Sequence, residues 1–118
     1  MVLVDTSVWV EHFRHGGIGL QELLYEGQVV CHPFIIGELA CGNLKNRAQI
    51  LAHLTALPTA HLAEHDEVMH FVEQYYLMGK GLGYVDVHLL SSAVLTNVSL
   101  WTIDKRLDKV SASLGLRM

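Results

Sequence analysis

Four acidic residues occupy positions from which they could act together on one substrate. Asp5 directly follows the apolar start of the chain, and Asp104 follows a second short apolar run. Asp86 falls in the first turn of an expected helix, and Glu38 lies inside another. In open parallel sheets the functional crevice lies beyond the carboxyl ends of the strands. If the two apolar runs are strands of such a sheet, we expect the carboxylates to meet at one edge of it.

Clustered carboxylates need a counter-charge. They repel one another, so they either share protons or bind a multivalent cation, and the few basic residues near them in sequence favour the cation. Oxygen ligands in a cytoplasmic protein favour Mg²⁺ or Mn²⁺. Such an ion binds a phosphodiester, lowers the pKa of a bound water and stabilises charge on the attacking and leaving oxygens. The predicted chemistry is hydrolysis of a nucleic-acid backbone.

The spacing of the acids leaves a second interpretation open. Asp5, Asp86 and Asp104 each stand at the start of an expected helix, where acidic side chains commonly cap the helix and interact with its dipole. Glu38 is harder to explain in this way. It has Ile35, Ile36 and Leu39 as near neighbours, so we expect it to be embedded in apolar surroundings, where an unpaired carboxylate is costly.

Strand and helix patterns alternate along the chain. Apolar periodicity, glycine stops and proline positions predict strands at residues 1–4, 28–31, 59–63 and 99–103, and helices at 7–14, 19–26, 34–43, 47–57, 66–78, 84–95 and 104–114. Parallel neighbours require crossover connections, which these helices supply. The sequence predicts one domain over residues 1–118: a three-layer α/β/α sandwich with a central, mostly parallel sheet.

The composition leads to expectations about assembly, RNA contacts and the cellular compartment of the protein. Hydrophobic residues make up 51% and charged residues 17% of the chain, with a mean hydropathy of +0.31, so we expect a subunit interface. The net charge of -4 requires any RNA contact to be local or mediated by a metal. No apolar run reaches the length of a bilayer, and the chain does not open like a signal peptide, so the cytoplasm is the expected compartment. Cys31 and Cys41 are expected to be reduced and buried.

The acids lie in segments that resemble the motifs of PIN-domain ribonucleases. The opening segment is Asp5-Thr6-Ser7-Val8-Trp9, after an N-terminal strand. Residues 37–39, 83–90 and 100–104 resemble the other three acid motifs of the family, in the same order. Within the family, the segments at residues 32–34 and 101–102 make the chain most similar to the VapC toxins of bacterial toxin–antitoxin pairs.

This resemblance implies roles for individual residues. Asp5, Glu38, Asp86 and Asp104 would be direct or water-mediated ligands of Mg²⁺ or Mn²⁺ and the catalytic residues, supported through hydrogen bonds by Thr6 and Thr102. It also implies an RNA substrate, a cognate antitoxin of the VapB type whose tail enters the active-site groove, and a homodimer. Some relatives carry a further acid shortly after the fourth, where this chain has Lys105 and Arg106. Those two basic residues are candidate contacts to RNA phosphates.

Other functions fit the sequence less well. His61-Leu62-Ala63-Glu64-His65 matches a zinc-peptidase pattern, but that site needs both histidines on one helix, and this segment reads as a strand leading into a loop. The glycine-rich residues 79–83 lack the Gly-Lys-Ser/Thr ending of a phosphate-binding loop. Two alternatives remain open: a non-catalytic binding module of the same fold, and a PIN nuclease outside toxin–antitoxin systems.

Overall fold

The computed structural model describes residues 1–118 and contains one parallel sheet of three strands. The strands are β1 (Val2–Val4), β2 (Val29–Val30) and β3 (Ser99–Trp101), and their order is β2-β1-β3. Val2 pairs with Val29 on one side and with Ser99 on the other. All three residues of β1 are buried, as expected for a central strand covered on both faces.

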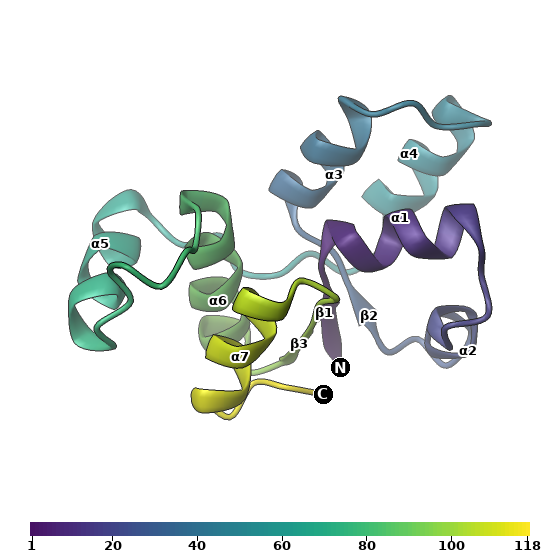
Figure 1. The fold of residues 1–118 in the computed structure, drawn as a ribbon. Helices are drawn as coiled ribbons and strands as arrows, with labels where there is room; N and C mark the ends of the chain where they lie inside the picture. Colours follow the sequence, from purple (N-terminus) through teal and green to yellow (C-terminus); the bar gives the residue numbers. More distant parts are fainter.

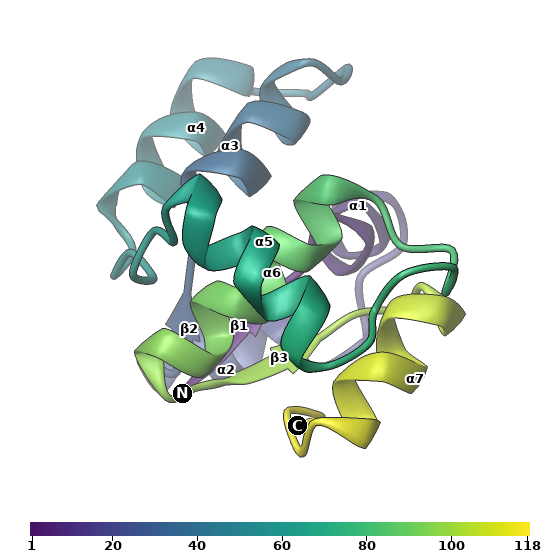
Figure 2. The same ribbon diagram turned by 90° about the vertical axis from the view of Figure 1, so that its left-hand side faces the viewer.

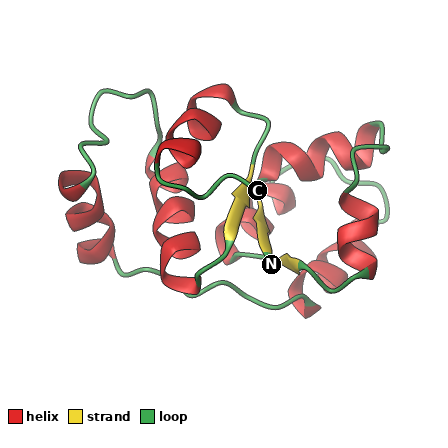
Figure 3. Ribbon diagram, turned by 90° about the horizontal axis from the view of Figure 1, so that it is seen from below, coloured by secondary structure: helices red, strands yellow, loops and turns green.

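Seven helices surround the sheet. They are α1 (Thr6–Arg14), α2 (Leu20–Tyr25), α3 (Pro33–Ala40), α4 (Arg47–Ala56), α5 (His65–Gln74), α6 (Tyr84–Thr96) and α7 (Lys105–Ser113). Figure 1 shows α1 to α4 on one side of the strands and α5 to α7 on the other. The view from below in Figure 3 shows the strands enclosed between these two groups. The predicted α/β/α sandwich with a parallel sheet is confirmed.

The third predicted strand, at residues 59–63, is wrong. Thr59 forms only an isolated parallel bridge with Cys31, through the hydrogen bonds from Cys31 N to Pro58 O and from Ala60 N to Cys31 O, both 2.8 Å. The reason lies in the neighbouring strand, because β2 ends at Val30 and the chain turns into α3 at Pro33. Residues beyond Ala60 therefore have no strand to pair with.

Helix α5 is shorter than the predicted range 66–78. It ends at Gln74, and Tyr76 adopts a left-handed conformation with φ of 53°. The turn is closed by hydrogen bonds from Tyr76 N to Glu73 O and from Leu77 N to Val72 O. Tyr75 and Tyr76, which follow the end of the helix, are both exposed, Tyr76 by 74%.

The expectation of two buried cysteines is half wrong. Both thiols are free, and Cys31 is buried, but Cys41 is exposed. Helix α3 was predicted to run to residue 43 but ends at Ala40, so Cys41 lies at the helix C-terminus on an open turn.

A core of 24 buried apolar residues joins the strands to the inner faces of the helices. None of the helices has the combined length and apolar character needed to cross a bilayer.

Candidate functional site: a cluster of acidic side chains

Asp5 stands at the carboxyl end of the central strand. Its backbone N–H donates to the carbonyl of Trp101 at 2.9 Å, which continues the pairing of β1 with β3. The residue is buried, and although it occupies the N-cap position of α1, its side chain makes no capping hydrogen bond. The capping interpretation of Asp5 is therefore wrong, and its carboxylate is available for another purpose.

Two hydroxyl groups hold that carboxylate. Ser7 Oγ and Thr102 Oγ1 donate to Asp5 Oδ2 at 2.7 and 2.8 Å. The hydroxyls are held in turn, since Ile103 N–H donates to Ser7 Oγ and Asp104 N–H donates to Thr102 Oγ1, each at 3.1 Å. Both hydroxyls bond the same oxygen, so the orientation of the Asp5 carboxylate is fixed while Oδ1 remains free.

Ser7 was not among the residues selected from the sequence. It joins segments that are 95 residues apart, because its hydroxyl also lies 3.2 Å from that of Thr102. The available signal was its position two residues after Asp5, in the first turn of the following helix. A short polar side chain at that position can fold back toward the acid.

Asp104 combines two roles that the sequence left open. It is the N-cap of α7, and its Oδ1 accepts hydrogen bonds from the backbone N–H groups of Arg106 and Leu107, each at 3.0 Å. The side chain is exposed, so its second oxygen is accessible from solvent. Capping thus accounts for one oxygen of Asp104 and leaves the other available to a ligand.

Asp86 lies in the first turn of α6. Its Oδ2 accepts a hydrogen bond from Gly83 N–H at 2.9 Å. The pKa of this carboxyl is raised, first by burial and then by the negative charges of Asp5 and Asp104, while the Gly83 hydrogen bond opposes the rise. The electrostatic contributions mean that Asp5 and Asp104 both act on Asp86 through their negative charges.

Glu38 lies on α3, where Thr6 Oγ1 donates to its Oε1 at 2.8 Å. The expectation that Glu38 is embedded in apolar surroundings is wrong, since its side chain is exposed. Helix α3 buries Ile35 and Leu39, which are four residues apart on one face, and Glu38 lies beside that face. The hydrogen bond to Thr6 ties this exposed carboxylate to the residue that follows Asp5.

The chemistry of the donor set fits a hard divalent cation. The two ion pairs of the structure join His15 to Glu11 and Arg117 to Asp108, so no basic side chain neutralises any of the four acids. No group of three or more His, Cys, Asp or Glu side chains is close enough to hold one ion directly. Mg²⁺ typically takes one or two carboxylates and completes its coordination with water, so a site for it does not require such a group. A zinc site built from several protein ligands does not fit.

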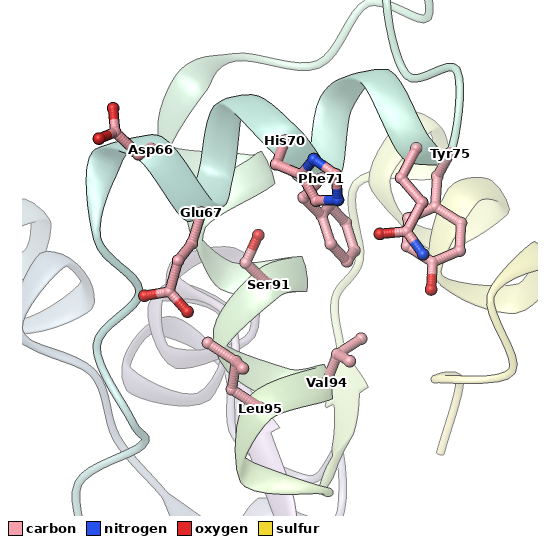
Figure 4. Close-up of a pocket in the computed structure, with 9 residues that line it drawn as sticks. Asp66, Glu67, His70, Phe71, Tyr75, Ser91, Val94 and Leu95 are labelled. Atoms are coloured by element: carbon pink, nitrogen blue, oxygen red, sulfur yellow. The ribbon is translucent and has the colours of Figure 1, made fainter.

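The remaining sequence motifs lie apart from the acids. His61 lies in an extended segment, and α5 begins only at His65, so the two histidines do not share a helix face and the zinc-peptidase pattern is accidental. A separate groove of about 540 Å³ lies between α5 and α6, and its lining includes Phe71, Val94 and Leu95 (Figure 4). None of the four acids lines this groove.

Comparisons with known proteins identify the family of the chain. Residues 2–113 match the family described as PIN domain. The chain is 44% identical over 119 aligned residues to Ribonuclease VapC32 from two strains of Mycobacterium tuberculosis, and the match covers 100% of this chain and 96% of that protein. The crystal structure of PAE2754 from Pyrobaculum aerophilum superimposes with a TM-score of 0.60 at 15% identity, covering 97% of this chain and 88% of that one. This second similarity supports the fold alone.

Proposed function

The chain belongs to the PIN-domain family, and from that premise we propose that it is a metal-dependent endoribonuclease of the VapC type, the toxin of a toxin–antitoxin pair. The observation that carries the proposal is the state of Asp5: a buried carboxylate that caps no helix, is oriented by two hydroxyls, and raises the pKa of a neighbouring acid. A purely structural acid has no need of like-charged neighbours.

In this proposal Asp5, Glu38, Asp86 and Asp104 hold Mg²⁺ or Mn²⁺, partly through water. The bound ion would activate a water molecule and stabilise the charge that develops on the phosphate oxygens. Ser7 and Thr102 fix the direction of Asp5, and Thr6 restrains Glu38. The Gly83 amide keeps Asp86 in place against the repulsion of the other acids. These contacts orient the ligands before substrate binds, as an efficient metal site requires.

The proposed substrate is RNA, and the proposed partner is a VapB-type antitoxin. The similarity to a ribonuclease named VapC32 supports both. Two free thiols are compatible with the reducing cytoplasm, the compartment in which we place the protein. A small neighbouring open reading frame for a DNA-binding antitoxin would support the pair, and its absence would favour a PIN nuclease that acts without an antitoxin.

A homodimer is also part of the proposal. The support is apolar surface, since Met69, Val94 and Leu95 on α5 and α6 are each more than 40% exposed. Light scattering of the purified chain should give twice the chain mass of 13.2 kDa. A mass of one chain at every concentration tested would contradict the dimer.

RNA cleavage in the presence and absence of metal tests the function. We expect no cleavage of structured RNA in EDTA, cleavage after addition of Mg²⁺ or Mn²⁺, and a rate at least about 100-fold lower for Asp5→Asn. Asp108→Asn is the matched control, because Asp108 pairs with Arg117 outside the acid cluster, and this variant should cleave at the wild-type rate. Cleavage that persists in EDTA or in Asp5→Asn would contradict the proposal. A folded wild type that binds RNA but cuts none of a broad panel would favour the non-catalytic binding module.

A further inference from the structure

A pocket lined by positive charge lies between α7 and the glycine-rich loop that precedes α6. It has a volume of about 300 Å³ and is lined by Lys80, Arg106, Lys109, Val110 and Ser113. The four residues from α7 follow the i, i+3, i+4, i+7 pattern, so they form one face of that helix. Lys80 comes from the loop on the opposite side. Figure 2 shows this loop running beside the first turn of α7.

The pocket concentrates positive charge in an acidic protein. It contains three of the eight lysine and arginine residues of a chain whose net charge is -4. None of the three forms an ion pair, because the one acid on this stretch of α7, Asp108, is bound in a bidentate pair by Arg117. Three unpaired cations around one cavity repel one another, and an anion in the cavity removes that repulsion.

The loop is shaped to receive the side chain of Arg106. Gly81 has φ of +76°, and a Cβ atom at this position would lie 2.7 Å from Arg106 Cδ. A side chain at position 81 would be strained by the positive φ and would displace the flexible end of Arg106. The arginine therefore packs against the glycine backbone, which limits its freedom before any ligand arrives. Less side-chain entropy is then lost on binding.

Both sides of the pocket, α7 and the glycine-rich loop, are hydrogen-bonded to acids of the proposed metal site. The backbone N–H of Arg106 donates to Asp104 Oδ1, and Gly83, two residues after Gly81, donates to Asp86 Oδ2. A strand of nucleic acid whose phosphate reaches the acids can therefore place a neighbouring phosphate over the pocket. Arginine and lysine are the usual protein contacts to backbone phosphates.

We propose that this pocket binds a phosphodiester group of the RNA strand next to the bond that is cut, with Lys80, Arg106 and Lys109 as its contacts. The proposal rests on the proposed function and adds the path of the substrate. Of the two residues expected from the sequence to contact phosphates, Arg106 lines the pocket and Lys105 does not, and Lys80 and Lys109 line it as well. Gly81 acts as a positioning residue for Arg106.

RNA binding without cleavage tests this subsite. Fluorescence anisotropy in EDTA, with a labelled single-stranded oligoribonucleotide, compares wild type with the double variant Lys80→Gln, Lys109→Gln. We expect affinity to fall roughly tenfold and the slope of log K against log salt to become shallower by up to about 1, since the single phosphate in the pocket loses two of its three contacts. Both lysines are exposed, so the variant should fold normally. Lys45→Gln is the control, because Lys45 lies in a different cavity with Arg14, and it should bind RNA as wild type does.

The outcomes separate this proposal from the one on which it rests. If the double variant binds RNA with unchanged affinity and salt slope, the subsite is wrong, whether or not wild type cleaves RNA in Mn²⁺. If wild type fails to cleave but the double variant still loses RNA affinity, the metal chemistry is wrong and the subsite stands. Polyglutamate that competes as well as RNA for wild type, but not for the double variant, would assign the pocket to an acidic peptide and overturn the RNA proposal.

Discussion

Hydroxyl groups are the main device that orients the acids at the scale of single residues. Asp5 is held by Ser7 and Thr102, and Glu38 is held by Thr6. A hydroxyl donates to the carboxylate without neutralising its charge, whereas a lysine or arginine would compete with a metal ion. None of the four acids has a basic partner in the structure, so no side chain would compete with a metal ion for them.

The sequence identifies these acids but not their hydrogen bonds. Asp5 and Asp104 follow apolar runs, so their positions beyond strands could be predicted. The contact of Ser7 with Thr102 spans 95 residues and depends on β1 and β3 being neighbours, an order that local patterns do not encode. The exposure of Glu38 was missed for a similar reason, because it depends on how α3 is rotated against the sheet.

His32 shows how a buried polar residue is satisfied. It is fully buried, its Nδ1 accepts from Phe34 N–H at 3.0 Å as the cap of α3, and its Nε2 lies 3.1 Å from Ser92 Oγ. Because Nδ1 accepts, the proton of the neutral ring is on Nε2 and points to Ser92. Burial, and to a smaller extent the nearby His88, lower the pKa of His32 to about 4.

This histidine should make stability depend on pH. Its unfolded pKa is about 6.5, so between pH 6.5 and 4 the unfolded chain binds a proton that the folded chain does not, and stability falls as pH falls. The free energy of unfolding should decrease by about 2 kcal/mol between pH 7 and pH 5 from this residue. Urea unfolding at both values measures it. His32→Asn keeps a capping acceptor for Phe34 N–H but does not titrate, so an equal decrease in this variant would refute the assignment.

At the scale of elements, Asp104 belongs both to the N-terminal cap of α7 and to the proposed metal site. Asp104 caps its first turn with one oxygen, and Arg106 and Lys109 of the same helix line the positive pocket. The start of α7 therefore fixes the distance between the acids and the proposed phosphate contacts. A change in the cap should disturb both.

Two substitutions of Asp104 separate its roles. Asparagine caps helices about as well as aspartate, so Asp104→Asn should retain wild-type stability in EDTA to within about 0.5 kcal/mol, whereas Asp104→Ala should lose about 1 kcal/mol. Both should lose metal-dependent cleavage, because neither keeps the charge. Urea unfolding and a cleavage assay on the three proteins make the comparison. Full cleavage by Asp104→Asn would show that its charge is not needed for catalysis.

Elements were predictable where the pattern was local. Proline at the start of α3 and glycine after α2 set those boundaries nearly as expected, because each acts through its own backbone. The predicted strand at 59–63 failed because a strand needs a partner of matching length, and β2 has only two residues. The predicted end of α5 was wrong because the helix is followed by a positive φ at Tyr76, a position where the sequence has no glycine to indicate a helix stop.

At the scale of the whole molecule, the order β2-β1-β3 places Asp5 and Asp104 at one edge of the sheet. The central strand ends at Asp5, and β3 runs parallel to it, so its carboxyl end delivers Thr102 and Asp104 to the same edge of the sheet. Helices α3 and α6, from opposite groups in Figure 1, add Glu38 and Asp86. The alternation of strands and helices predicted this class of fold, and the site is a consequence of its topology.

The central claim is that these acids form a site for a divalent metal ion. Mn²⁺ binding is its most direct test, because the measurement does not require the RNA target to be known. Isothermal titration of metal-free protein should show saturable binding to wild type and to the control Asp108→Asn. Asp5→Asn should bind Mn²⁺ at least about tenfold more weakly, since it removes the charge of a buried ligand. Equal binding to wild type and Asp5→Asn, or no binding to wild type, would contradict the account.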